Sequence, residues 1–301
     1  MSVNLKFQSD LLTNLDEGFN MKSTTRMIMV VMLMLCLAIT INAQDETNEL
    51  PNITMLETGE SFSGELDVNN ILHATLYSFG ATEGDTVAIS MTSSDEGLLD
   101  PLMILYGPSG KFIVFNDDAD YPDDINATIE GFEITESGYY YVMATTYDTY
   151  SQIFVYGADL RLGTDDAEMV EFDIVVEGNI NPETEHDFTM MEISDMVNVE
   201  IGAESSIGYV TFAASEGDMM TLSTASDDVD TVLYLFDGNG NLLAVNDDMD
   251  FIGEETNSQI ANFEIIEDGI YLLFATVVDY DQFNDDDYVT GEIEVSITAA
   301  E

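Results

Sequence analysis

Residues 230–250 read DTVLYLFDGNGNLLAVNDDMD and residues 100–120 read DPLMILYGPSGKFIVFNDDAD, with seven identities in 21 positions at a constant offset of 130. In both stretches an apolar run leads into a Gly-containing turn, and a second apolar run and an Asn-Asp-Asp triplet follow. Short apolar runs separated by such turns are typical of β-hairpins buried between two sheets. The two stretches therefore predict one β domain that occurs twice in the chain.

The repeat extends on both sides of this hairpin. FGATEGD at 79–85 matches FAASEGD at 212–218, and GFEITESGYYYVMAT at 131–145 matches NFEIIEDGIYLLFAT at 262–276. The flanking offsets are 133 and 131, so only loop lengths differ. Short strands with polar turns and no long amphipathic helical pattern predict an all-β fold of two tandem antiparallel, jelly-roll-like β-sandwiches, each about 100 residues long.

These repeats and the N-terminal sequence divide the chain into parts. Within the predicted connector, 169–176 could add an edge strand, and 157–162 is the expected counterpart of the closing strand at 291–298. The predicted parts are an N-terminal extension ahead of the true start at 1–20, a signal peptide at 21–43, a polar spacer at 44–57, a first sandwich at 58–163, a connector at 164–189 and a second sandwich at 190–299.

The N-terminal region predicts export. Lys22 and Arg26 precede thirteen consecutive apolar residues at 27–39, and Ala43 offers a small residue for cleavage. A membrane-spanning helix needs about 20 apolar residues, whereas a signal peptide needs about 7–15. We therefore expect a secreted bacterial protein with no membrane attachment after cleavage. The only cysteine, Cys36, is lost with the leader, so core packing or a metal must hold the mature fold.

The charge of the chain restricts its partners. Asp and Glu number 60 against 5 Lys and Arg, which gives a formal net charge of −55. Nucleic acid is excluded as a partner because phosphate binding needs clustered basic residues, and an anionic membrane is disfavoured for the same reason. Cations, a basic partner or a halophilic, saline habitat are compatible with this charge.

The acidic loop after each return strand is the clearest candidate site. Calcium takes about six to eight oxygen ligands, and an Asp at the start of the preceding strand could complete each loop. The alternative is that the Asn and Asp side chains only cap turns. The candidate calcium ligands are Asp100, Asn116, Asp117, Asp118 and Asp120 in the first repeat and Asp230, Asn246, Asp247, Asp248 and Asp250 in the second.

Other side chains give no catalytic pattern. His73 and His186 lie in no metal or triad motif, and Ser109 lies in a turn, so we expect no enzyme activity. Strand alternation should place some tyrosines outward, where they could bind a sugar or a protein, although Tyr is also common in strands for packing alone, which we favour. These tyrosines are Tyr139, Tyr140, Tyr141, Tyr147 and Tyr150, with Tyr271, Tyr280 and Tyr288 in the second repeat.

The order of these motifs resembles the bacterial pre-peptidase C-terminal (PPC) domain. The shared features are Glu-Gly-Asp before a strand, the pattern DxxLxLxxxxG from Asp230 to Gly240 (with Met103 at the first Leu of the other repeat), Asn-Asp-Asp, and a strand of Gly138-Tyr139-Tyr140 type. The resemblance covers most of both repeats. It implies a secreted β-sandwich accessory module of peptidases, whose relatives in bacterial collagenases bind collagen and calcium, but no peptidase domain accompanies the repeats here.

Residues and resemblance together predict a secreted, non-catalytic binding protein of two β-sandwich modules, stabilised by calcium. The expected ligand is an extracellular protein or polysaccharide. The alternative is a folding or targeting accessory of a separately encoded secreted peptidase.

Overall fold

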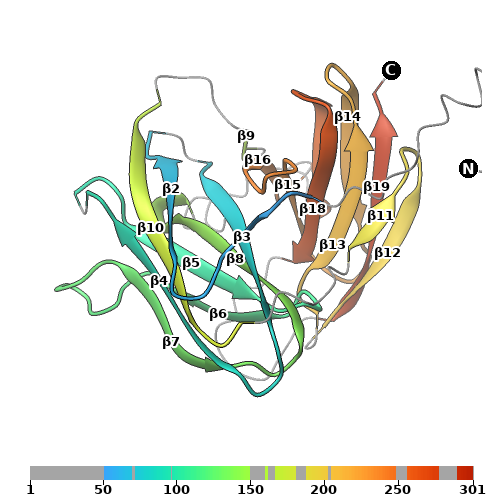
Figure 1. Cartoon of the computed structure of the whole chain (residues 1–301). Coiled ribbons are helices and arrows are strands. Elements are labelled where there is room, and N and C mark those ends of the chain that lie inside the picture. Colours follow the sequence, from blue (N-terminus) through green and yellow to red (C-terminus); the bar gives the residue numbers. More distant parts are fainter. Residues whose placement is uncertain are drawn as a thin grey trace, which may run out of the picture. The chain divides into compact units, whose positions relative to one another are not determined.

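The structure is a computed structural model of the whole chain (Figure 1). It divides into Met1–Glu49 and Leu50–Glu301, and only the second unit is described below. The described residues are 51–69, 72–95, 97–149, 160–161, 167–180, 188–202, 205–248, 256–277 and 290–300. The predicted signal peptide, His186 and Asp250 lie outside them. Within these ranges no helix has the length and apolar character needed to cross a membrane.

The first repeat builds two sheets, with strand orders β1-β3-β8-β5-β6 and β2-β10-β4-β7. The sheets are antiparallel except for the pairing of β1 with β3. The strands are β1 (Thr54–Met55), β2 (Ser61–Asp67), β3 (Ala74–Ala81), β4 (Thr86–Ser93), β5 (Pro101–Tyr106), β6 (Phe112–Asn116), β7 (Ala127–Glu133), β8 (Gly138–Thr146) and β10 (Met169–Gly178).

The second repeat also builds two sheets, with orders β11-β13-β18-β15-β16-β9 and β12-β19-β14-β17. These four sheets confirm the predicted all-β fold and are consistent with two β-sandwiches. The strands are β9 (Leu160–Arg161), β11 (Thr189–Met191), β12 (Met196–Ile201), β13 (Gly208–Ala214), β14 (Met219–Ala225), β15 (Thr231–Phe236), β16 (Leu242–Asn246), β17 (Gln259–Glu264), β18 (Gly269–Val277) and β19 (Gly291–Ala299).

The hairpin that identified the repeat has the same register in both copies. Met103 lies opposite Asn116 in the β5-β6 pair, and Leu233 lies opposite Asn246 in the β15-β16 pair. Both hairpins have an irregularity in register next to the turn. The two turns have the same length, and turn length sets the register of a hairpin. The same residues of each repeat therefore face the core, because side chains alternate between the two faces of a strand.

The connector differs from its prediction. The expected edge strand at 169–176 is part of β10, which lies between β2 and β4 and so is an inner strand. Its apolar residues alternate inward, as do those of β19, its counterpart in the second repeat. The expected counterpart of the closing strand, 157–162, instead contributes β9, which pairs with β16 of the other repeat.

The described chain has three hydrophobic cores. One lies within the first repeat and one within the second, each formed by side chains from both of its sheets. The third combines side chains from both repeats, including Tyr106, Tyr141, Tyr209 and Phe274. The strands β5, β8 and β15 are therefore almost entirely buried, because one face packs in a repeat's own core and the other in the shared core.

This arrangement decides the fate of the tyrosines. Tyr140 packs in the core of the first repeat, while Tyr139 and Tyr141 point the other way, into the shared core. All three are buried, as is Tyr271. The outward face that could have offered aromatic side chains to a ligand is thus covered by the other repeat. Tyr147 is 47% exposed, and Tyr150, Tyr280 and Tyr288 lie outside the described residues.

Candidate functional site

Three carboxylates of the second repeat meet beside one end of the β15-β16 hairpin. Asp230 immediately precedes β15, and Asp247 and Asp248 immediately follow β16. Because the strands are antiparallel, the start of one lies beside the end of the other. One carboxylate oxygen from each residue lies within 4.8 Å of the others, and all three side chains are half-buried. We call Asp230, Asp247 and Asp248 the acidic triad.

Asn246 shapes the loop that holds this triad. Its buried side-chain Nδ2 donates to the carbonyl oxygen of Asp248 at 3.1 Å, and its Oδ1 accepts from the backbone N–H of Gln259 at 2.6 Å. Asn116 makes the same two contacts in the first repeat, with Asp118 and Thr128. The two Asn side chains therefore cap the backbone, as the alternative interpretation of the loops expected for them.

The triad contains carboxylate oxygens with no protein partner. Asp230 Oδ1 and Asp247 Oδ1 are buried and accept no hydrogen bond within the described part of the chain. Burial raises the pKa of Asp247 to about 7, and the carboxylates of Asp230 and Asp248 add to the rise. Burial likewise raises the pKa of Asp230, with a further contribution from Asp248. The triad thus favours a bound positive charge, either a proton or a cation.

A buried group of hydroxyls lies directly behind the triad. Thr224 Oγ1 lies 2.6 Å from Thr231 Oγ1, which lies 3.2 Å from Ser258 Oγ. Ser258 Oγ also donates to the backbone carbonyl of Asp247 at 2.6 Å. We call Thr224, Thr231 and Ser258 the hydroxyl cluster. Thr224 lies in β14 and Thr231 in β15, while Ser258 directly precedes β17, so the three hydroxyls connect these strands beside the backbone of the triad.

The first repeat lacks this support. The positions of the hydroxyl cluster are occupied in the first repeat by Met91, Pro101 and Ala127, and all three are buried. We did not predict this difference from the sequence, although the aligned repeats show it as three positions where a Ser or Thr of the second repeat is matched by an apolar residue of the first. Only the structure places those three changes together.

The acidic side chains of the first repeat are also less enclosed. Asp100 is exposed, whereas its counterpart Asp230 is half-buried. Burial, followed by Asp118, Asp117 and Asp148, raises the pKa of Asp100. Burial, followed by Asp117 and Asp124, raises the pKa of Asp118. The compact arrangement of three carboxylates within 4.8 Å occurs in the second repeat and not in the described part of the first.

Asp120 belongs to a separate small turn. Its backbone N–H donates to the carbonyl oxygen of Asp124 at 3.0 Å, and Asp124 returns a bond to Asp120 at 2.8 Å. Its side chain is exposed. Asp120 is therefore placed by backbone pairing, while the equivalent Asp250 lies outside the described residues.

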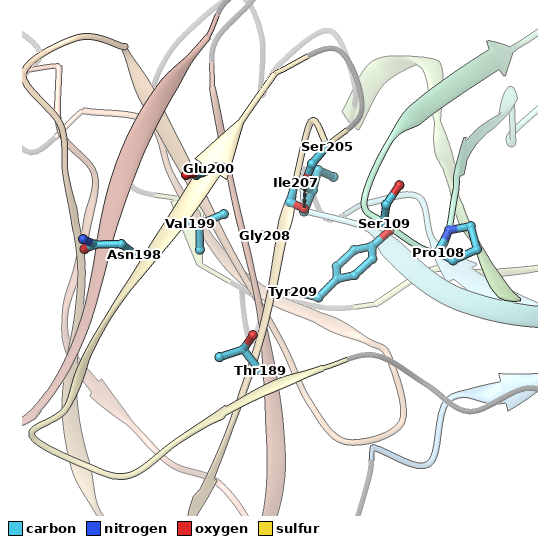
Figure 2. Close-up of a pocket in the computed structure, with 10 residues that line it drawn as sticks. All are labelled: Pro108, Ser109, Thr189, Asn198, Val199, Glu200, Ser205, Ile207, Gly208 and Tyr209. Carbon is cyan, nitrogen blue, oxygen red and sulfur yellow. Dashed lines mark hydrogen bonds between the residues drawn. The ribbon is translucent and has the colours of Figure 1, made fainter. Parts of the chain in front are cut away.

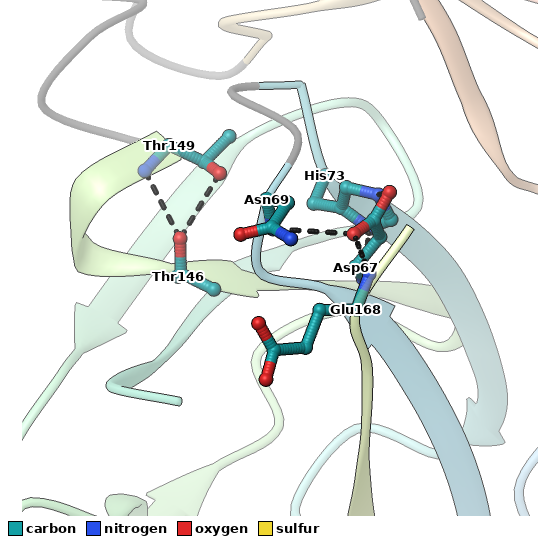
Figure 3. Close-up of polar contacts among 6 residues, drawn as sticks. All are labelled: Asp67, Asn69, His73, Thr146, Thr149 and Glu168. Carbon is teal, nitrogen blue, oxygen red and sulfur yellow. Dashed lines mark hydrogen bonds and ion pairs between the residues drawn. The ribbon is translucent and has the colours of Figure 1, made fainter. Parts of the chain in front are cut away.

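His73 has a structural role at the end of β2 (Figure 3). Its Nδ1 accepts the backbone N–H of Asp67 at 2.9 Å, and its Nε2 lies 3.7 Å from Asp67 Oδ2. Asp67 Oδ1 accepts from the backbone of Asn69 at 3.2 Å and of Glu168 at 2.7 Å. Burial lowers the pKa of His73 more than Asp67 raises it. These contacts tie β2 to the residue before β10.

A polar hollow of about 210 Å³ lies where the turn at 107–110 meets β12 and β13 (Figure 2). Glu200 is the one charged side chain among the residues that line it, and they include no His or Cys. The lining therefore offers hydrogen bonds, and it contains no nucleophile paired with a base. Its residues are Pro108, Ser109, Thr189, Asn198, Val199, Glu200, Ser205, Ile207, Gly208 and Tyr209.

Comparisons with known proteins give low-similarity neighbours. No protein-family model matches the chain, and no curated protein matches it. Among solved structures, the pre-peptidase C-terminal domain of a collagenase from Bacillus anthracis is 16% identical with a TM-score of 0.30, covering 40% of this chain and all of that one. A periplasmic inhibitor of g-type lysozyme from Aeromonas hydrophila is 13% identical with a TM-score of 0.24, covering 37% of this chain and all of that one.

A third neighbour, tripeptidyl peptidase 2, is 10% identical with a TM-score of 0.24 and covers 82% of this chain but 24% of its own. Similarities of this size transfer no function or ligand to this chain. What the chain itself presents is an all-β fold with an acidic triad in its second repeat.

Proposed function

We propose that this chain is a secreted, non-catalytic binding protein whose second sandwich holds a calcium ion at Asp230, Asp247 and Asp248. The observation that carries the proposal is the pair of buried carboxylate oxygens, on Asp230 and Asp247, that accept no hydrogen bond from the described protein. A buried carboxylate oxygen without a partner costs about 1–3 kcal/mol or more, and a cation removes that cost.

Calcium fits the chemistry of these ligands best. The triad offers only hard oxygen ligands, whereas zinc sites are usually built with His or Cys. Magnesium requires near-ideal octahedral geometry and keeps several of its waters. Calcium accepts irregular sets of carboxylates, carbonyls and waters, so three carboxylates on a loop and a strand start suit it.

The hydroxyl cluster supports the site by fixing the backbone of the acidic triad. Ser258 holds the carbonyl of Asp247, and Thr231 follows Asp230 directly in the chain. Ligands held in place before binding lose less freedom when the cation arrives. The first repeat has Met91, Pro101 and Ala127 at these positions, so we expect its acidic loop to bind calcium more weakly.

The proposed partner of the protein is an extracellular protein or polysaccharide. A net charge of −55 is compatible with a neutral or a basic partner, and binding to a basic partner should weaken as salt rises. The alternative function is that of an accessory to a separately encoded secreted peptidase. Pull-down by an insoluble polymer favours the first function, and co-purification with a peptidase favours the second.

Calcium titration of the EDTA-stripped protein at constant high ionic strength tests the site. Calcium at about 100 times its dissociation constant should stabilise the protein by about 2.7 kcal/mol, which raises the melting temperature by about 5–10 °C. Asp247→Asn with Asp248→Asn should abolish the rise, while the matched pair Asp117→Asn with Asp118→Asn should leave most of it. A melting temperature that responds to salt but not to calcium would show that the triad binds no calcium.

A further inference from the structure

The shared core between the repeats is built from equivalent positions of the two copies. Nine of the first-repeat residues at this interface have a counterpart that also lies there, and none of these pairs is polar on both sides. Leu72 and Tyr139 do not, because their counterparts Ser205 and Ile270 lie outside the cluster. The pairs, at the offsets of the sequence repeat, are Ala74 and Ile207, Leu76 and Tyr209, Leu102 and Val232, Ile104 and Tyr234, Tyr106 and Phe236, Phe112 and Leu242, Phe115 and Val245, Tyr141 and Leu272, and Met143 and Phe274.

Aromatic rings join the two copies across this core. Tyr106 of the first repeat contacts Phe274 of the second edge-on, with ring centroids 6.1 Å apart. Tyr141 contacts Tyr209 with centroids 5.0 Å apart. Tyr209 is also tied through its hydroxyl, which donates to the carbonyl oxygen of Gly107 at 3.0 Å. The interface thus combines apolar burial with specific geometry.

The hairpin turns dock reciprocally at the rim of this core. The turn of the first repeat presents the carbonyl oxygen of Gly110, which accepts from the backbone N–H groups of Ser206 and Ile207 at 3.0 Å each. The turn of the second repeat presents the carbonyl oxygen of Gly240, which accepts from the backbone N–H of Leu76 at 2.8 Å. Figure 2 shows the first of these turns, with Pro108 and Ser109 facing Ile207 and Tyr209.

Both docking turns depend on a glycine at the same position. Gly110 has φ of +82°, and a Cβ on it would lie 2.0 Å from the carbonyl oxygen of Ile207. Gly240 has φ of +89°, and a Cβ on it would lie 2.7 Å from the carbonyl oxygen of Leu76. Each turn therefore needs glycine both for its own backbone and for close approach to the other repeat.

We infer that the two repeats unfold as a single cooperative unit. They pack against each other within one chain through a self-complementary interface, as the two subunits of a two-fold dimer do. A two-fold interface uses the same patch on both partners. The nine pairs of equivalent positions form such a patch here, although the individual contacts differ: Gly110 accepts from Ile207, while Gly240 accepts from Leu76, two positions further along the repeat. The pairing of β9 with β16 adds a strand that lies between β8 and β10 in the chain to the sheet of the second repeat. The inference does not depend on calcium.

Equilibrium unfolding of the full chain in urea, with hydrogen exchange read by mass spectrometry on peptides of each repeat, tests this inference. With EDTA present throughout, peptides from β4 and β7 in the first repeat and from β14 and β17 in the second should lose protection at one common midpoint. Phe172→Leu, in the core of the first repeat alone, should lower both midpoints equally. Separate midpoints in the unmodified chain, or a shift confined to the first repeat, would overturn the inference.

A matched pair of glycine variants isolates the interface. Gly84 has φ of +90° with no atom within 4 Å of an added Cβ, so Gly84→Ala introduces the backbone strain without the collision that Gly110→Ala introduces. Gly110→Ala should lower the midpoint further than Gly84→Ala and should separate the transitions of the two repeats. Equal effects would contradict the inference.

Tyr209→Phe is the milder variant if Gly110→Ala does not fold. It removes only the hydroxyl that donates to Gly107 and leaves the ring in place. A lowered common midpoint for both repeats is the expected result, and a change confined to the second repeat would oppose the inference.

Discussion

Ser258 Oγ lies 2.6 Å from the backbone carbonyl oxygen of Asp247, to which it donates, and the first repeat has Ala127 at the position of Ser258. One hydroxyl thus fixes the acidic loop of the second repeat where the first repeat has a methyl group. The difference makes the two loops unequal although both read Asn-Asp-Asp.

Removing the Ser258 hydroxyl should weaken calcium binding while every carboxylate stays in place. We expect Ser258→Ala to destabilise the protein by about 1–3 kcal/mol, because Asp247 and Thr231 lose a buried partner. The dissociation constant for calcium, measured by isothermal titration calorimetry, should rise severalfold. Thr92→Ala, at an exposed hydroxyl of β4, is the control and should change neither quantity. Unchanged calcium affinity in Ser258→Ala would show that the hydroxyl cluster has no role in the proposed calcium site.

Neutralising Asp247 should stabilise the calcium-free protein near pH 8. Its pKa is raised to about 7 in the folded state, so the folded protein holds this proton more tightly than the unfolded chain. Stability from this group therefore increases as pH falls from about 7 towards about 4. Asp247→Asn should add about 1–2 kcal/mol at pH 8 after allowance for solvent screening, and it should abolish the calcium response.

Denaturant unfolding in EDTA at pH 8 and pH 5 measures this effect. The gain from Asp247→Asn should shrink at pH 5, where the wild-type carboxyl is already protonated. Asp117→Asn, the equivalent change in the first repeat, serves as the control. A loss of stability in Asp247→Asn at pH 8 would mean that the carboxylate has a protein partner.

The partly buried His73 should change stability with pH in the opposite direction. Its pKa is lowered on folding, so the unfolded chain binds the proton more tightly, and stability falls as pH drops below about 6.5. His73→Gln should flatten this part of the pH profile because Gln does not titrate. The Asp247→Asn background is suited to the measurement, since it removes the opposing contribution. An equal slope with and without His73 would contradict the prediction.

The surface charge predicts strong stabilisation by salt. The screening length falls from about 10 Å at 0.1 M salt to about 3 Å near 1 M, so repulsion among 60 acidic residues should weaken over that range. The melting temperature in EDTA should rise with NaCl and by the same amount with KCl, because screening does not depend on which cation is present. Sucrose is the control for general exclusion effects. A flat response to both salts would count against a halophilic surface.

Local patterns predicted the repeated hairpin because strand period and turn length act within about twenty residues. The same patterns predicted the Asn-Asp-Asp loops. In both loops the Asn side chain donates to a backbone carbonyl two residues further on, as Asn commonly does in turns. The stretch 169–176 was predicted as an edge strand, but β10 lies between β2 and β4, because sheet order depends on which distant strands pair.

The sequence by itself determined the all-β class, the duplication and the position of the acidic loops, since each follows from residues close together in the chain. Tertiary structure alone decided that Tyr139 and Tyr141 are buried, because the surface they face belongs to the other repeat. It also decided that the two acidic loops differ. Thr224 and Ser258 stand 34 residues apart in the chain, and they support Asp247 only because folding brings β14 and β17 together.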